Sequence, residues 1–324
     1  MADAVLDLGC HCTAALFAGD APMFALADGT IRRGAGADAC LRAHSALLAA
    51  VASADRRSLL TSGEDGRVCR TGVSGDPAEL AAIPRKWIGS VASSVRGTLA
   101  FAAGRSVWLS EAGGPLRELQ HPRSVAGIAF SPDGSLLAVA RYGGVTLHAV
   151  SSATPPAELD WKGIYAALAF SPDGRFLLAF MQDELLHGWR LKDSRHFRMS
   201  GYPGRIKDWS WSADGRWLAT SGAHAAVLWP FEGEDGPMGS TALEVGAPRG
   251  DARVSAVACH PRRDEIALGY ADGAIVVASF DDDAAVTLRD AGRSAVSSVA
   301  WNSEGSRLAF GSELGECGVL DVRQ

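Results

Sequence analysis

The stretch VAGIAFSPDGSLLAVARYGGVTLHAV, residues 125–150, contains the pattern that decides the fold. It holds three apolar runs of five or six residues each. The turn formers SPDG, residues 131–134, separate the first two runs, and YGG, residues 142–144, separates the last two. Gly, Pro and Asp favour turns, and apolar runs this short suit strands better than helices. The stretch therefore predicts three consecutive strands joined by tight turns.

The same pattern returns along the chain, because SPDG occurs again at 171–174, forty residues further on. Short polar segments between the copies predict a fourth, outer strand in each. A repeated unit of about forty residues with four antiparallel strands is a β-propeller blade, which must stack on its neighbours to bury its apolar faces. The other copies cover residues 12–33, 45–70, 88–110, 165–191, 206–231, 254–280 and 296–322. We therefore expect an all-β, eight-bladed β-propeller of four-stranded antiparallel blades, in a single domain over residues 1–324.

The two ends of the chain predict how the propeller closes. The last copy ends at its third strand, residues 319–322, and leaves no residues for an outer strand. Residues 4–8, AVLDL, precede the first copy and have the pattern of an unpaired strand. Open strand edges are unfavourable in sheets. We therefore expect the N-terminal strand to close the ring by becoming the outer strand of the last blade.

These motifs resemble the WD40-repeat family, in a degenerate form of bacterial type. SPDG after the first strand is typical of that family, as is Asp-Gly between the second and third strands, found at 28–29, 65–66 and 272–273. Trp189 and Trp229 end third strands in the same way. The family's terminal Trp-Asp pair is missing, and a His before the first strand is clear only at His44. The resemblance implies a protein–protein interaction scaffold, with the family's internal His/Asp network mostly absent.

Composition limits the classes of function and the kinds of partner. The net charge of −6 disfavours nucleic-acid binding, because phosphates need a basic footprint. No apolar run approaches the length of a membrane span, and the start lacks the basic region of a secretory signal. The six cysteines form no disulfide framework. We therefore expect a cytoplasmic protein with a protein or peptide partner, and no nucleic-acid or membrane partner.

One cluster could carry metal or redox chemistry. Cys10 and Cys12 lie on one face of a strand because alternate residues point the same way. With ring closure, Cys317 would come near them. A zinc site needs four ligands, and no fourth is evident. A metal site and a redox pair stay open, but we expect buried hydrophobic cysteines, with no cofactor and no tightly bound metal.

Catalysis has no local signal in the sequence. There is no Gly-Lys-Ser/Thr phosphate loop, no GxSxG elbow and no paired-Cys haem motif. We therefore expect a non-enzyme. The alternatives are an enzyme or cofactor-binding propeller with a channel site, and an accessory subunit of a larger complex.

The loops that lead into the first strands predict a docking face. They are repeatedly basic, whereas the turns between second and third strands are acidic. We expect an inner basic ring that docks an acidic partner segment, although ordinary solvated turn residues are the alternative. Trp and Arg are enriched at binding hot spots. The predicted contact residues are Arg123, Arg205, Arg253, Arg293, Trp87 and Trp161.

Overall fold

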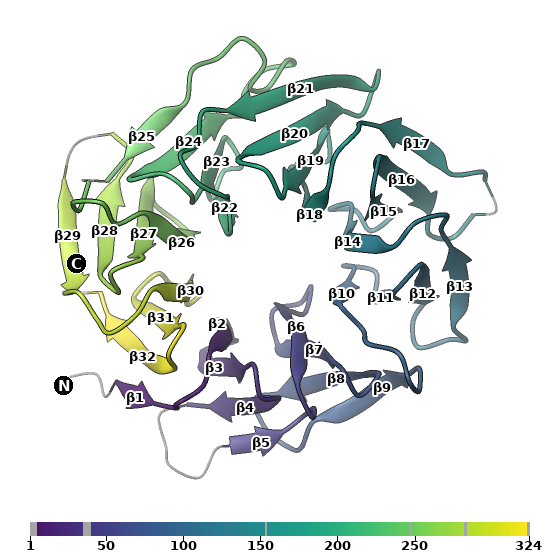
Figure 1. Ribbon diagram of the computed structural model, residues 1–324, viewed down its shortest axis with the longest axis horizontal. Coiled ribbons are helices and arrows are strands. Elements are labelled where there is room, and N and C mark those ends of the chain that lie inside the picture. Colours follow the sequence, from purple (N-terminus) through teal and green to yellow (C-terminus); the bar gives the residue numbers. More distant parts are fainter. Residues whose placement is uncertain (1–4, 35–39, 153, 247, 282–283, 323–324) are drawn as a thin grey trace. The chain divides into compact units, whose positions relative to one another are not determined.

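A computed structural model describes residues 5–34, 40–152, 154–246, 248–281 and 284–322. Its strands form eight four-stranded antiparallel sheets (Figure 1). The described residues contain no helix. The predictions of an all-β chain and of eight blades are confirmed. Contacts divide the chain into a first unit, residues 1–42 with 202–324, and a second unit, residues 43–201. Each unit contributes four blades.

The second unit contains the four blades β6–β9, β10–β13, β14–β17 and β18–β21, each with its strands in chain order. These strands are β6 (Leu47–Ala52), β7 (Ser58–Gly63), β8 (Arg67–Gly72), β9 (Ala78–Ala82), β10 (Ser90–Ser93), β11 (Leu99–Ala103), β12 (Ser106–Ser110), β13 (Arg117–Gln120), β14 (Val125–Phe130), β15 (Leu136–Arg141), β16 (Gly144–Ala149), β17 (Ala157–Asp160), β18 (Tyr165–Phe170), β19 (Phe176–Met181), β20 (Leu185–Arg190) and β21 (Arg195–Ser200).

The first unit contains the blades β2–β5, β22–β25, β26–β29 and a fourth ordered β30-β31-β32-β1. Its strands are β1 (Leu6–Asp7), β2 (Cys12–Ala18), β3 (Ala21–Leu26), β4 (Thr30–Arg33), β5 (Cys40–Arg42), β22 (Trp209–Trp211), β23 (Trp217–Thr220), β24 (Ala226–Pro230), β25 (Leu243–Val245), β26 (Val254–Cys259), β27 (Glu265–Tyr270), β28 (Ile275–Ser279), β29 (Ala285–Arg289), β30 (Val296–Trp301), β31 (Arg307–Ser312) and β32 (Glu316–Asp321).

The N-terminal strand β1 completes the last blade, as predicted. It runs antiparallel to β32, with Leu6 opposite Cys317 and Asp7 opposite Glu316. The strand is shorter than the predicted residues 4–8, and Ala4 lies outside the described residues. The first and last parts of the sequence are therefore hydrogen-bonded into one sheet.

The SPDG motif works as a self-contained turn. The Ser131 hydroxyl accepts a hydrogen bond from the Leu136 amide at 2.9 Å and donates one to Asp133 at 2.6 Å. Asp133 also accepts from the amide of Ser135 at 3.0 Å. The bond from Ser131 is the main reason that the pKa of Asp133 falls to about 2. Gly134 has a φ of 70°, a conformation that favours glycine. The same Ser-to-Asp bond recurs between Ser171 and Asp173 and between Ser212 and Asp214, so the turn forms in the same way in other copies.

Polar side chains on the innermost strands join neighbouring blades of the first unit. Asp208, just before β22, accepts a hydrogen bond from the amide of Val257 in β26 at 2.9 Å, and Ser210 accepts one from Cys259 at the same distance. Burial raises the pKa of Asp208 to about 6. Ser298 of β30 accepts from the Ala15 amide of β2 at 3.0 Å. Backbone donors at the blade contacts are thereby satisfied, as buried amides require.

His44, which lies before the first strand of its blade, forms a network with Asp65 and Thr61. His44 Nδ1 lies 3.0 Å from Asp65, and its Nε2 lies 2.8 Å from the Thr61 hydroxyl. In the β22–β25 blade a tyrosine stands in a comparable place, because the Tyr202 hydroxyl is 2.7 Å from Thr220 and accepts from Trp229 Nε1 at 2.7 Å. The His and Asp residues are thus paired at His44, the position that the sequence indicated, and an aromatic hydroxyl bonds the corresponding Thr in a second blade.

Candidate functional site

Two of the predicted contact residues lie together in the first unit. Arg205 precedes β22 and Arg253 precedes β26, and both side chains are exposed. The guanidinium of Arg253 packs against Gly204, the residue before Arg205. The contact is so close that a Cβ atom at position 204 would lie 2.4 Å from Nη1 of Arg253. Neither guanidinium has a hydrogen bond or ion pair to any residue that the structure describes. Two exposed guanidinium groups in neighbouring loops, both unpaired among the described residues, can bind carboxylates with bidentate hydrogen bonds.

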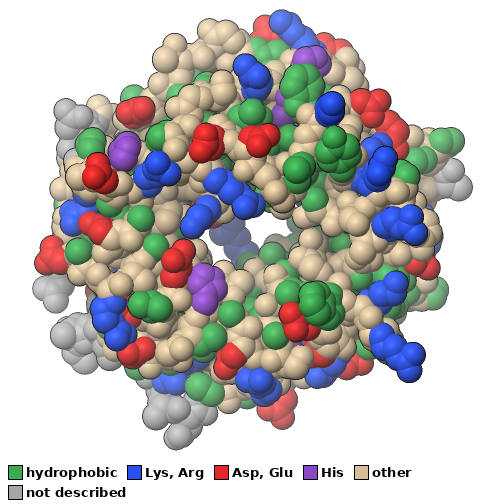
Figure 2. Space-filling view, in the orientation of Figure 1, with side chains coloured by type: hydrophobic (Ala, Val, Ile, Leu, Met, Phe, Trp, Pro, Cys, Tyr) green, Lys and Arg blue, Asp and Glu red, His purple; other side chains and the backbone are tan. Residues whose placement is uncertain are grey.

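The surroundings of this pair carry both signs of charge. Lys207, two residues beyond Arg205, forms an ion pair with Glu313 at 3.6 Å. Arg249 pairs with Asp272 at 3.3 Å. Figure 2 shows Lys and Arg side chains gathered over the region of β22 and β26, with acidic side chains further out. The acidic turns therefore neutralise Lys207 and Arg249, and Arg205 and Arg253 keep their charge available. We name Arg205 and Arg253 the arginine pair.

The other two predicted arginines differ from this pair. Arg293 donates to Asp7 at 2.6 Å and to Glu316 at 3.3 Å, so carboxylates of the chain itself already hold its guanidinium. The hydrogen bond that Arg293 donates to Asp7 is the main reason that the pKa of Arg293 is raised. Arg123 lies between β13 and β14 in the second unit and is exposed. Its side chain has no polar partner among the described residues.

The two predicted tryptophan anchors occupy opposite environments in the second unit. Trp87 lies in the loop between β9 and β10 and is 66% exposed. Trp161 follows β17 and is half-buried, with its ring stacked on His187 at a centroid distance of 3.9 Å. It also packs on the apolar core shared by the β14–β17 and β18–β21 blades. Trp87 can therefore meet a partner directly, whereas Trp161 mainly packs between blades.

His187 lies at the centre of this aromatic stack. Its side chain is fully buried, and neither ring nitrogen has a hydrogen-bond partner among the described residues. Trp189 meets it edge-on at 4.6 Å. Desolvation by burial is the main reason that the pKa of His187 falls to about 3, with smaller contributions from His196 and Arg198. The ring is therefore neutral near pH 7 and behaves as a core aromatic.

The three cysteines of the suspected metal cluster also lie near one another. Cys12 and Cys317 are fully buried, and both sulfur atoms lie beside Gly311. A Cβ atom at position 311 would lie 2.2 Å from the sulfur of Cys12 and 3.6 Å from that of Cys317. The contact with Cys317, followed by burial, raises the pKa of the Cys12 thiol well above its usual range. Cys10 is half-buried. Among the described residues no three His, Cys, Asp or Glu side chains are arranged to hold a metal ion. The absence of bound metal stays a prediction.

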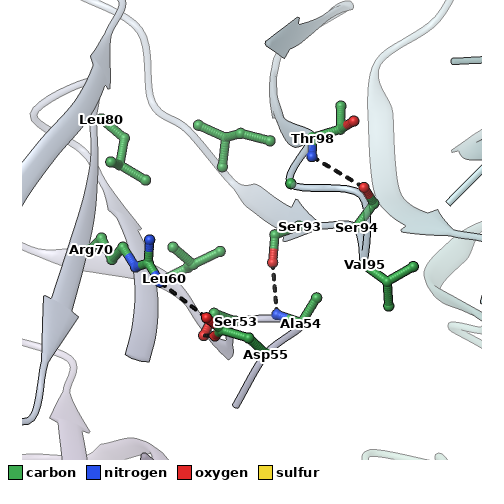
Figure 3. A pocket seen from close by; sticks show the side chains of 12 residues that line it. Ser53, Ala54, Asp55, Leu60, Arg70, Leu80, Ser93, Ser94, Val95 and Thr98 are labelled. Carbon is green, nitrogen blue, oxygen red and sulfur yellow. Dashed lines mark hydrogen bonds and ion pairs between the residues drawn. The ribbon is translucent and has the colours of Figure 1, made fainter. Parts of the chain in front are cut away.

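A cavity in the second unit was missed by sequence reasoning. It lies between the β6–β9 and β10–β13 blades and has a volume of about 380 Å³. Figure 3 shows Leu60, Leu80 and Val95 around it, with Arg70 at one side and Ser93 at the other. The signal that could have revealed it is a small residue at 93, a position that is aromatic in several other copies.

Comparison with known proteins gives two family-model matches, each over part of the chain. The family model for the anaphase-promoting complex subunit 4 WD40 domain matches residues 257–324, and the model for the WD domain, G-beta repeat, matches residues 113–145. No curated protein matches the chain in sequence. No helix among the described residues is long and apolar enough to cross a membrane.

Solved structures share the fold at low sequence identity. The computationally designed Ika8 protein has a TM-score of 0.74 and 17% identity, with 97% of each chain covered. The C-terminal WD40 domain of Sif2 has a TM-score of 0.73 and 15% identity, with 99% of each chain covered. A chain of the mitotic checkpoint complex has a TM-score of 0.65 and 18% identity, with 82% of this chain and 84% of that chain covered.

The repeat motifs, the eight four-stranded blades and these matches agree. The chain has the β-propeller fold, and two of its segments, residues 113–145 and 257–324, match WD40 family models.

Proposed function

We propose that this protein is a non-catalytic interaction platform whose arginine pair docks an acidic segment of a partner protein. The carrying observation is that Arg205 and Arg253 lie in neighbouring loops, both exposed and without a carboxylate partner among the described residues, with the Arg253 guanidinium against Gly204. Guanidinium groups match carboxylates in shape and charge. A segment rich in Asp and Glu is therefore the partner chemistry that suits the site.

Affinity must come from more than the arginine pair. Exposed ion pairs are each worth only about 0–1 kcal/mol. Trp87 and Arg123 are exposed in loops of the second unit, and we propose them as separate contacts of the partner protein with that unit. Arg293 contributes only if a partner carboxylate displaces Asp7, and Trp161 contributes mainly by supporting the fold.

An assembly role is consistent with the class. By its name, the family matched at residues 257–324 belongs to a subunit of a complex, and one similar structure is a chain of another complex. We propose that this chain likewise works as a subunit of a larger complex. We place it in a reducing compartment such as the cytoplasm, because all six cysteines are free thiols.

A direct binding measurement tests the docking proposal. The probe is a fluorescein-labelled peptide rich in Asp and Glu, and the readout is fluorescence anisotropy. The double variant Arg205→Glu/Arg253→Glu should weaken binding about tenfold or more, because it replaces attraction with repulsion. Binding to the native protein should also weaken as ionic strength rises, because exposed charges are screened.

The matched control reverses the same number of charges elsewhere. Arg57 and Arg262 are exposed and lie in turns that follow innermost strands, whereas the arginine pair lies in loops that precede them. Arg57→Glu/Arg262→Glu should therefore leave binding nearly unchanged. An equal loss in both double variants would show that net charge alone drives binding, and no loss in the first would refute the site.

A further inference from the structure

The residue that ends the innermost strand is aromatic in several blades. Phe130 ends β14, Phe170 ends β18 and Trp301 ends β30. Each packs on the core of the preceding blade. Trp301 also donates a hydrogen bond from Nε1 to the Ala258 carbonyl of that blade at 2.9 Å. A large ring at this position therefore fills the space between two blades.

Ser93 occupies this position in the β10–β13 blade. It directly precedes Ser94, which accepts the turn hydrogen bond from Gly97 just as Ser131 accepts one from Gly134. The Ser93 side chain points to the preceding blade, because its hydroxyl accepts a hydrogen bond from the Ala54 amide at 2.9 Å. The Ser93 side chain therefore points towards the preceding blade, as Phe130, Phe170 and Trp301 do, but it is much smaller than an aromatic ring.

The cavity of about 380 Å³ lies where the missing ring would pack. In the next pair of blades, Phe130 packs on the cluster that contains Ala100 and Leu109, which face each other across β11 and β12. The equivalent residues of the β6–β9 blade are Leu60 and Arg70, which face each other across β7 and β8. Both line the cavity (Figure 3).

A second exchange accompanies Ser93. Ala54 occupies the same position in its turn as Pro132 does in the SPDG turn. The two turns match because the Arg56 amide donates to the Ser53 carbonyl, as the Gly134 amide donates to the Ser131 carbonyl. Proline has no amide hydrogen, so an apolar ring can lie beside Pro132 without leaving a donor unpaired. Ala54 has an amide hydrogen, and Ser93 binds it. The hydrogen bond from Ala54 to Ser93 thus satisfies the Ala54 amide, and the small serine side chain leaves the cavity open.

We propose that this cavity binds an aromatic side chain of a partner polypeptide. Two apolar side chains on the rim, Leu80 at 44% and Val95 at 67%, are exposed, so an inserted ring would remove both from water. The Arg70 guanidinium lines the same space, held by Ser58 at 2.7 Å and Asp55 at 3.3 Å. Its positive charge complements the negative face of an aromatic ring.

The volume also agrees with this occupant, because ligand cavities start at about 300 Å³. The site belongs to the second unit and does not include the arginine pair of the first unit. Each proposal can therefore fail without the other.

The test uses N-acetyl-L-tryptophanamide as the probe and saturation-transfer NMR as the readout. The native protein should saturate the indole protons in preference to the methyl protons of N-acetyl-L-leucinamide. The double variant Ala54→Pro/Ser93→Phe recreates the Pro132 and Phe170 arrangement and fills the cavity from within. Its affinity for the probe should fall about tenfold or more.

Two measurements make the result decisive. The filled variant should melt no lower than the native protein, because a filled cavity gains packing contacts. Ser93→Thr keeps the hydroxyl and is too small to fill the cavity, so it should retain binding. Undiminished binding by a folded, filled variant would overturn the proposal. So would a preference for the leucine probe, or no saturation transfer to the native protein.

Discussion

Arg293 donates a hydrogen bond to Asp7 at 2.6 Å across 286 positions of the chain, and its Nε reaches Glu316 at 3.3 Å. Asp7 belongs to β1 and Glu316 to β32, and the two residues lie opposite each other in the last blade. One guanidinium therefore holds the N-terminal strand against the C-terminal strand.

Removal of residues 1–9 should destabilise the protein. We propose that the chain is one domain, so its blades should unfold in a single transition that depends on every blade contact. Loss of β1 leaves β32 with an open edge and Arg293 without Asp7. The melting temperature should fall by about 5 °C or more. Arg293→Gln in the full chain should cause a smaller fall, and an unchanged melting temperature for the truncated protein would contradict the closing role of β1.

The two tryptophans should respond differently to truncation. Trp161→Ala removes the ring that stacks on His187 and should lower the free energy of unfolding by about 3 kcal/mol. Trp87→Ala should change it by less than about 0.5 kcal/mol, because the side chain is mostly exposed. Urea denaturation measures both values. Equal losses of unfolding free energy in the two variants would contradict a packed Trp161 and an exposed Trp87.

The buried His187 should make the protein less stable in acid. Its pKa is about 3 in the folded protein and 6.5 in the unfolded reference. The unfolded state therefore binds more protons between these values, so stability is complete above about pH 6.5 and falls as the pH drops towards 3. His121 contributes in the same direction, because its pKa is lowered to about 4, mainly by burial. His187→Phe keeps a ring in the stack and should reduce the slope of melting temperature against pH.

The control for this prediction is a second histidine in the same stack. His196 is exposed and lies 5.3 Å from the His187 ring. His196→Ala should leave most of the slope in place. If His187→Phe and the native protein lose stability in parallel from pH 6.5 downwards, another group is responsible.

Much of the fold could be predicted because its signals are local. The bonds among Ser131, Asp133 and Gly134 lie within a few residues, so the motif carries its own turn wherever it occurs. Its period identified the blades, and their count followed. The unpaired pattern at the N-terminus and the missing last strand together predicted the β1–β32 pairing.

The candidate site was predictable only in outline. Sequence placed basic residues in the loops before innermost strands, and Arg205 and Arg253 do lie together in one unit. It could not show that Arg293 is held by Asp7, since these residues are far apart in the chain. It also could not separate the exposed Trp87 from the stacked Trp161, because both are loop tryptophans beside a basic residue.

The sequence by itself determined the repeat, the strand and turn order and the closing strand, because each depends on backbone preferences within a short segment or on the count of segments. Only the tertiary structure decided which charges are neutralised and where space is left between blades. Ser93 shows the reason: a serine at a strand end is unremarkable locally, and it opens a cavity only because the facing blade presents Leu60 and Arg70. Contacts between side chains of different blades depend on packing, which has no period in the sequence.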